Sequence, residues 1–187
     1  MGENLATSPI ADRLGAEGGA GLAMRGPSES QWEGFRATST SGPIDRAALL
    51  TIRDVISREE PLAMPTLDDY LNPTTVEVQL QDGLGDATAA RIDIQWTTTS
   101  DYKFHYTDTE DVNVRWGKHP HDGDYIHASG LEHYHPPPDA SSNPDEVEES
   151  CIKQSLEVLV TRAVFRVWRT AYHRDSLDPL NAASNPP

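Results

Sequence analysis

The sequence predicts an α+β fold, in which an antiparallel sheet of four to five strands is packed by an N-terminal helix and a long C-terminal helix. Residues 44–59 and 145–172 carry apolar side chains at helical spacing. Between them, from Pro73 onward, apolar and polar residues alternate with a period of two, which is typical of half-buried strands. A run of strands between two helices predicts one sheet with both helices on its apolar face.

The ends of both helices are marked by residues that suit them. Pro43 fits the first turn of the first helix, and Pro61 ends it. For the second helix, Asn143 fits the N-cap position and Pro144 the first turn. Residues 61–73, which contain three prolines, are predicted to be an irregular connection between the first helix and the sheet.

Five segments between the helices are predicted to be strands. They are residues 76–80, 90–96, 102–106, 112–116 and 131–135. The third and fourth form a hairpin across the turn TDTED. Alternation in this hairpin places Phe104 and Val114 toward the core, and His105 and Arg115 together on the opposite, polar side.

The domain is expected to span residues 43–173, because 187 residues suffice for one domain with its own core. Residues 1–42 are rich in Gly, Ala, Ser, Thr and Glu and show no sustained apolar period. They are therefore predicted to be a disordered N-terminal arm. Residues 174–187 are predicted to be a flexible C-terminal tail.

The chain is strongly acidic, with a formal net charge of -15 from 30 acidic and 15 basic residues. An acidic chain with only three lysines is typical of a halophilic protein, and a mesophilic acidic protein is the alternative. At molar salt the Debye length falls to about 3 Å, so the net charge does not exclude binding to RNA. Cys151 is the only cysteine, and no segment approaches the roughly 18 apolar residues of a membrane span. We expect a cytoplasmic protein that makes no use of a membrane.

Six of the seven histidines fall within residues 102–139. Imidazole exchanges protons near neutral pH and binds transition metals, so such crowding predicts a site. Side chains on one face of paired strands stand about 5 Å apart, so that His105 and Arg115 can share one ligand. His133 and His135 share one side of the fifth strand.

Three motifs in this stretch resemble those of the TumE-like toxin family: YKFHY at residues 102–106, RWGKHPH at 115–121 and EHYH at 132–135. The family pattern is aromatic-x-aromatic-His, then Arg-aromatic-Asp-Asn-x-Pro-His, then Pro-His-His-x-His. Six residues match it: His105, Arg115, Pro120, His121, His133 and His135. Gly117 and Lys118 replace the Asp-Asn pair, and Glu132 replaces the first histidine of the last motif. If the family aspartate orients a catalytic histidine, this chain has lost that partner or supplies it from elsewhere.

The resemblance covers about residues 44–170 and is that of a haloarchaeal-type member. It implies a toxin component of a prokaryotic toxin–antitoxin pair. A cognate antitoxin is then the expected partner, and a small helix-turn-helix protein is one candidate for it.

The histidines and Arg115 have the chemistry of a metal-independent ribonuclease. One imidazole would take the proton of the 2′-hydroxyl, another would protonate the leaving oxygen, and Arg115 would stabilise the phosphate. His105 or His133 would be the base and His135 or His121 the acid. On this hypothesis the protein needs no cofactor.

Two other hypotheses stay open. His133 and His135, with His121 or His105, give three imidazoles for a zinc or manganese ion, although Glu132 points away from His133. Alternatively, the histidines only form hydrogen bonds at the surface of a non-catalytic interaction module.

Overall fold

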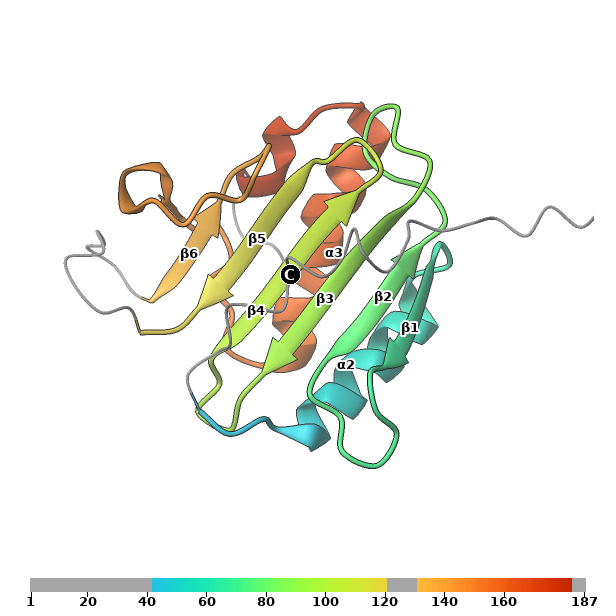
Figure 1. Cartoon of the computed structure of the whole chain (residues 1–187), viewed down its shortest axis with the longest axis vertical. Helices are drawn as coiled ribbons and strands as arrows, with labels where there is room; N and C mark the ends of the chain where they lie inside the picture. The colour runs from blue at the N-terminus through green and yellow to red at the C-terminus, as the bar shows by residue number, and fades with distance from the viewer. Residues whose placement is uncertain (1–41, 121–130, 183–187) are drawn as a thin grey trace, which may run out of the picture.

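The computed structural model describes residues 42–120 and 131–182 (Figure 1). In this part of the chain seven strands form one antiparallel sheet, in which each strand pairs with the next along the chain. The strands are β1 (Ala63–Leu67), β2 (Val76–Leu80), β3 (Ala90–Trp96), β4 (Tyr102–Asp108), β5 (Asn113–Lys118), β6 (Glu132–His135) and β7 (Glu148–Glu149). The predicted α+β class is confirmed, but the sheet is larger than the four to five strands predicted.

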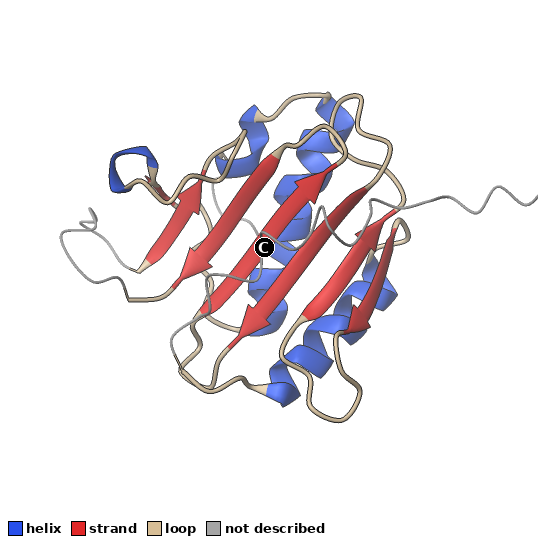
Figure 2. Cartoon of the chain, in the orientation of Figure 1, coloured by secondary structure: helices blue, strands red, loops and turns tan. Residues whose placement is uncertain are grey.

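Two long helices, α2 (Arg46–Glu59) and α3 (Glu157–Arg174), lie behind the same face of the sheet (Figures 1 and 2). They contact each other, and Arg162 of α3 donates two hydrogen bonds to the carboxylate of Glu59 at the end of α2. No helix of the described residues covers the other face, which is turned toward the viewer in Figure 2. The sheet therefore has one apolar, covered face and one polar face.

The start of α2 confirms the predicted first helix. The side chain of Asp45 accepts a hydrogen bond of 3.0 Å from the backbone N–H of Ala48, and so caps the N-terminus. Leu49, Ile52 and Ile56 then recur at helical spacing and are fully buried against the sheet. Full burial stabilises by about 1.5–3 kcal/mol for a side chain of this size.

Strands β2 and β3 bury alternate residues, as the period of two predicts, whereas every residue of β4 is buried. In β3, Ile92 and Ile94 are fully buried beneath the helices, whereas Arg91 and Asp93 are half-buried on the polar face. Side chains from the strands and from α3 complete the core: Val76, Val78, Phe104, Tyr106, Val114, Trp116, Val164, Phe165 and Trp168. The core thus holds the backbone of the central strands, and through it the polar face, in fixed register.

The first correction concerns residues 61–73, where an irregular connection was expected. Residues 63–67 form β1, which pairs with β2 from Ala63 opposite Leu80 to Leu67 opposite Val76. Proline argues against a central strand, but β1 is an edge strand with one neighbour, where Pro65 is tolerated. The opposite edge, β7, adds the seventh strand with only two residues, Glu148 and Glu149.

The second correction concerns the helix predicted from residue 145. Asn143 does cap a helix, because its side chain accepts a hydrogen bond from the backbone N–H of Asp145. That helix is only the short 3-10 helix η2 (Pro144–Glu146). Residues 148–149 then pair with β6 as a strand, and α3 begins at Glu157. The pairing of residues 148–149 with β6 therefore overrides the helix signals of residues 143–146.

Part of the segment expected to be a tail packs onto the domain. Residues Asp178–Asn181 form a second short 3-10 helix, η3, and its Leu180 is fully buried. The indole Nε1 of Trp116 donates a hydrogen bond of 2.9 Å to the carbonyl oxygen of Leu180. The segment after α3 is thereby tied to β5, the strand that also carries Arg115. Within the described residues, neither α2, α3 nor any shorter helix has the length and apolarity to cross a membrane.

Candidate active site

A row of polar side chains crosses the polar face of the sheet. Asp93 on β3 lies opposite His105 on β4, His105 lies opposite Arg115 on β5, and Arg115 lies opposite His135 on β6. Phe104 and Val114 are fully buried on the other face, so the hairpin is oriented as its alternation predicts. One short segment from each of four neighbouring strands thus contributes to one line of side chains.

A second row of residues lies two residues along the strands from the first. In it Lys103 is opposite Gly117, and Gly117 is opposite His133. The ring of His133 occupies the space above Gly117, where an added Cβ would be too close to Nε2. A side chain at position 117 would therefore displace the imidazole of His133. We call His105, Arg115, His133 and His135 the histidine–arginine cluster.

The rings of His133 and His135 are held by backbone carbonyl groups. Nδ1 of His133 lies 2.9 Å from the oxygen of Leu131, and Nδ1 of His135 lies 2.5 Å from the oxygen of Ser141. Since a carbonyl oxygen can only accept, each Nδ1 carries a hydrogen. In the neutral rings the lone pair is therefore on Nε2. The two ring centroids are 5.1 Å apart and nearly perpendicular.

Arg115 connects the cluster. Its Nη2 lies 3.0 Å from Nε2 of His135, which can accept a hydrogen bond, and 3.1 Å from the hydroxyl oxygen of Ser142. Only 8% of Arg115 is exposed. A guanidinium held in so dry an environment attracts an anion more strongly than one in water does.

The histidines of the cluster are more deeply buried than an open sheet face would suggest. His105 is 8% exposed, His133 2% and His135 0%. Burial, together with the positive charges of Arg115 and Lys103, lowers the pKa of His105 to about 3, although a hydrogen bond with Asn113 opposes the shift. At neutral pH His105 is therefore uncharged.

Asp93 supplies a carboxylate beside His105. It stands on the adjacent strand, directly opposite His105. Its Oδ1 accepts a hydrogen bond of 2.6 Å from Nε of Arg91, whose Nη2 also donates to Glu77. Burial raises the pKa of Asp93, and the contact with Arg91 opposes this shift. The carboxylate is thus fixed within the row by a neighbouring ion pair.

His119 is a residue that the sequence predictions missed. Its ring lies against that of His133, with centroids 4.6 Å apart, and it is half-buried at the rim of the cluster. Burial lowers its pKa. The signal was present in the sequence, because Arg115, Gly117 and His119 are two residues apart and so share one face.

The remaining predicted site residue, His121, lies outside the described residues. Within residues 42–120 and 131–182, no three His, Cys, Asp or Glu side chains are arranged to hold a metal ion. The structure thus brings His105, Arg115, His133 and His135 together and adds His119 and Asp93 to them.

These features define an α+β protein with a buried histidine–arginine cluster on the polar face of a single antiparallel sheet. The family model described as "Toxin TumE" matches residues 52–167, which is more than half of the chain and includes every described residue of the cluster. The chain belongs to the TumE toxin family. Membership indicates a toxin component of a toxin–antitoxin system, and it implies a cognate antitoxin. No curated protein and no solved structure matches the chain.

Proposed function

We propose that this toxin cleaves RNA at the histidine–arginine cluster without a metal ion. The observation that supports the proposal is the register of β4, β5 and β6, which puts Arg115 between His105 and His135 on one face. A cation flanked by imidazoles is suited to a phosphodiester, because it offsets the charge of the phosphate while the imidazoles move protons.

The proposed reaction is an internal transfer. The 2′-oxygen attacks phosphorus and forms a new P–O bond, and its proton passes to the base. The bond from phosphorus to the 5′-oxygen breaks, and the acid gives a proton to that oxygen. The products are a 2′,3′-cyclic phosphate and a 5′-hydroxyl, so neither water nor a cofactor is consumed.

His133 is the best candidate for the base. Its Nδ1 hydrogen is directed to the carbonyl oxygen of Leu131, which leaves the lone pair on Nε2 to take a proton. His105 is less suited, since a pKa of about 3 makes it a weak base. The acid remains to be chosen between His135 and His121.

The place of the phosphate is indicated by Ser142. Its exposed side chain accepts a hydrogen bond from Nη2 of Arg115. A phosphate oxygen that takes the place of this hydroxyl would bond to the guanidinium while Ser142 moves toward solvent. Arg115 would then lose much of its effect on His105, whose pKa would rise.

The test compares growth and RNA cleavage for matched variants. Expression of the wild-type chain without antitoxin should arrest growth, and His133→Ala and Arg115→Lys should relieve the arrest. An ammonium at position 115 cannot reproduce the planar fork that a guanidinium offers a phosphate. His173→Ala and Arg166→Lys are the matched controls, because both side chains are exposed on α3, behind the sheet.

The purified wild-type chain should cut RNA in the presence of a chelator, and both cluster variants should cut at least tenfold more slowly. Cleavage that the chelator abolishes would instead favour the metal-binding hypothesis. No cleavage and no arrest by the wild-type chain would leave the cluster as a contact surface. An RNA target is also consistent with a location in the cytoplasm. Co-purification of the toxin with its antitoxin tests whether the antitoxin is a helix-turn-helix protein.

A further inference from the structure

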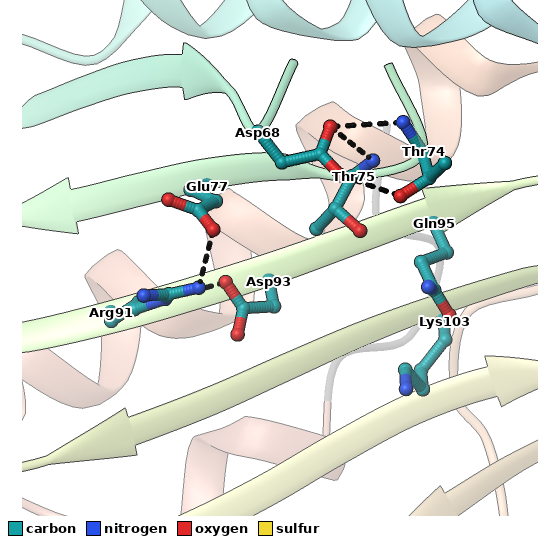
Figure 3. A pocket seen from close by; sticks show the side chains of 8 residues that line it. All are labelled: Asp68, Thr74, Thr75, Glu77, Arg91, Asp93, Gln95 and Lys103. Carbon is teal, nitrogen blue, oxygen red and sulfur yellow. Dashed lines mark hydrogen bonds and ion pairs between the residues drawn. The ribbon is translucent and has the colours of Figure 1, made fainter. Parts of the chain in front are cut away.

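A pocket of about 390 Å³ lies on the polar face of the sheet, beside the histidine–arginine cluster (Figure 3). Its floor is formed by side chains of β2, β3 and β4, and its wall by residues 68–75, which connect β1 to β2. A volume of this size is within the range of sites that hold small molecules. It does not include any residue of the cluster itself.

The wall of the pocket is held in place by Asp68. Oδ1 of Asp68 accepts hydrogen bonds of 2.9 Å and 3.0 Å from the backbone N–H groups of Thr74 and Thr75. The hydroxyl of Thr74 donates to the other carboxylate oxygen, Oδ2. Figure 3 shows these bonds between Asp68 and the two threonines. The pocket is therefore formed before any ligand arrives.

One side of the pocket holds a cation between two carboxylates. Arg91 is bonded to both Glu77, at 2.9 Å, and Asp93, at 2.6 Å, so its charge is already compensated. No aromatic or aliphatic side chain is present among the described residues that line the pocket. The ligand is thus expected to be polar and to bind by hydrogen bonds.

The other side presents an acceptor next to a donor. Oε1 of Gln95 is buried and has no hydrogen-bond partner among the described residues. Lys103, which lies directly opposite Gln95 on β4, is 5% exposed and also lines the pocket. A buried acceptor without a partner destabilises the protein, so a ligand that donates to Gln95 gains affinity.

An amide acceptor next to an ammonium donor matches the edge of a nucleobase that carries an amino group beside a ring nitrogen. Adenine and cytosine have such an edge on the Watson–Crick side, where guanine presents a protonated ring nitrogen beside its amino group and uracil has no amino group. Lys103 and His105 are two residues apart on the same face of β4, so Lys103 lies about 7 Å along the strand from the row, whereas Asp93 belongs to both the row and the pocket. Asp93 and Arg115 are two strands apart, about 10 Å, which is within the span of one nucleotide.

We propose that this pocket binds the base of the nucleotide whose phosphate lies at Arg115, and that Gln95 and Lys103 select adenine or cytosine over uracil. The proposal rests on the proposed function, since it takes RNA as the substrate. It adds that cleavage depends on sequence.

The first experiment titrates the full-length chain with free adenosine, cytidine, guanosine and uridine, and follows binding by calorimetry. These nucleosides have no phosphate, so their binding does not depend on the cluster. Adenosine or cytidine should bind at least tenfold more tightly than uridine. Gln95→Met keeps the length of the side chain but removes the acceptor, and it should abolish this preference. Gln79→Met is the matched control, because Gln79 is exposed on β2 outside the pocket.

The second experiment maps the cut sites in a mixed-sequence RNA. The wild-type chain should cut beside adenine or cytosine, and Gln95→Met should cut with less preference among the four bases. Urea unfolding of each variant establishes that it is folded. If the wild-type chain cuts RNA but binds no nucleoside, or if Gln95→Met changes neither result, this inference is wrong and the proposed function stands. If adenosine or cytidine binds as expected and no RNA is cut, the pocket stands and the proposed function fails.

Discussion

The imidazole of His133 lies over the backbone of Gly117, so that a Cβ at position 117 would stand 2.6 Å from Nε2. The ring cannot move freely, because Nδ1 is bonded to the carbonyl oxygen of Leu131 and the residue is 2% exposed. The ring of His133 therefore keeps its place only because residue 117 has no side chain.

Gly117→Ala tests this relationship. The added methyl group should push His133 from its place, slow RNA cleavage at least tenfold and lower the free energy of unfolding by about 1–3 kcal/mol. Urea unfolding and a cleavage assay measure the two effects. In a chain that already carries His133→Ala, the same Gly117→Ala change should cost less than about 0.5 kcal/mol. An equal cost in both chains would show that the ring is not what the methyl group meets.

The stability of the protein should depend on pH through His105. Burial, Arg115 and Lys103 lower its pKa from 6.5 to about 3, so between these values the unfolded chain binds a proton that the native chain does not. The free energy of unfolding is therefore highest, as far as His105 is concerned, above pH 6.5, and it falls as the pH falls toward 3. From pH 7 to pH 5, wild type should lose about 2 kcal/mol relative to His105→Gln.

The comparison with His105→Gln is needed because Asp93, whose pKa is raised, titrates with the opposite effect. His173→Gln serves as a control, since that histidine is exposed. Urea unfolding at the two pH values measures the difference. Parallel losses in wild type and His105→Gln would mean that His105 is protonated in the native state at pH 5.

The segment after α3 should contribute to stability through Leu180. This side chain is fully buried, and its carbonyl oxygen accepts from Trp116. Leu180→Ala should lower the free energy of unfolding by about 2–5 kcal/mol. Leu177→Ala, at a position 38% exposed, should change it by less than about 0.5 kcal/mol. Similar values for the two variants in urea unfolding would contradict the packing of this segment.

The melting temperature should rise with potassium chloride concentration, as expected of a halophilic protein. A net charge of -15 is self-repulsive at low salt and is screened at high salt. Salt also weakens exposed ion pairs such as Arg162–Glu59, but each contributes only about 0–1 kcal/mol. A chain with Asp86→Asn and Glu110→Gln, both at exposed positions, should depend less on salt. A melting temperature that is flat or falls with salt would remove the halophilic interpretation.

The first helix and the four central strands could be predicted because their patterns are long and local. Residues 76–80, 90–96 and 102–106 alternate without interruption, so register and face follow from the sequence. The edges of the sheet could not be predicted in this way. β1 contains Pro65, and β7 has two residues, so neither shows a pattern, and both form because a neighbouring strand offers pairing.

Alternation along the strands was also enough to predict that His105 and Arg115 share a face. Their burial could not be predicted, since it depends on contacts from distant segments, such as those of Ser141 and Ser142 with His135 and Arg115. The same applies to the pKa of His105, which follows from burial and two cations on neighbouring positions. The alternation of residues predicts the face toward which a side chain points. Its burial and its pKa depend on the tertiary structure.

The two ends of the sheet limit how another molecule can associate with this protein. A chain that added a strand beside β1 would meet Pro65, which has no N–H to donate. Beside β7 it would find two paired residues that both carry carboxylates. Strand addition is therefore disfavoured at both ends, for a second copy as well as for an antitoxin. Recognition is left to side chains on the faces and helices, so that surface substitutions alone could change which antitoxin neutralises the toxin.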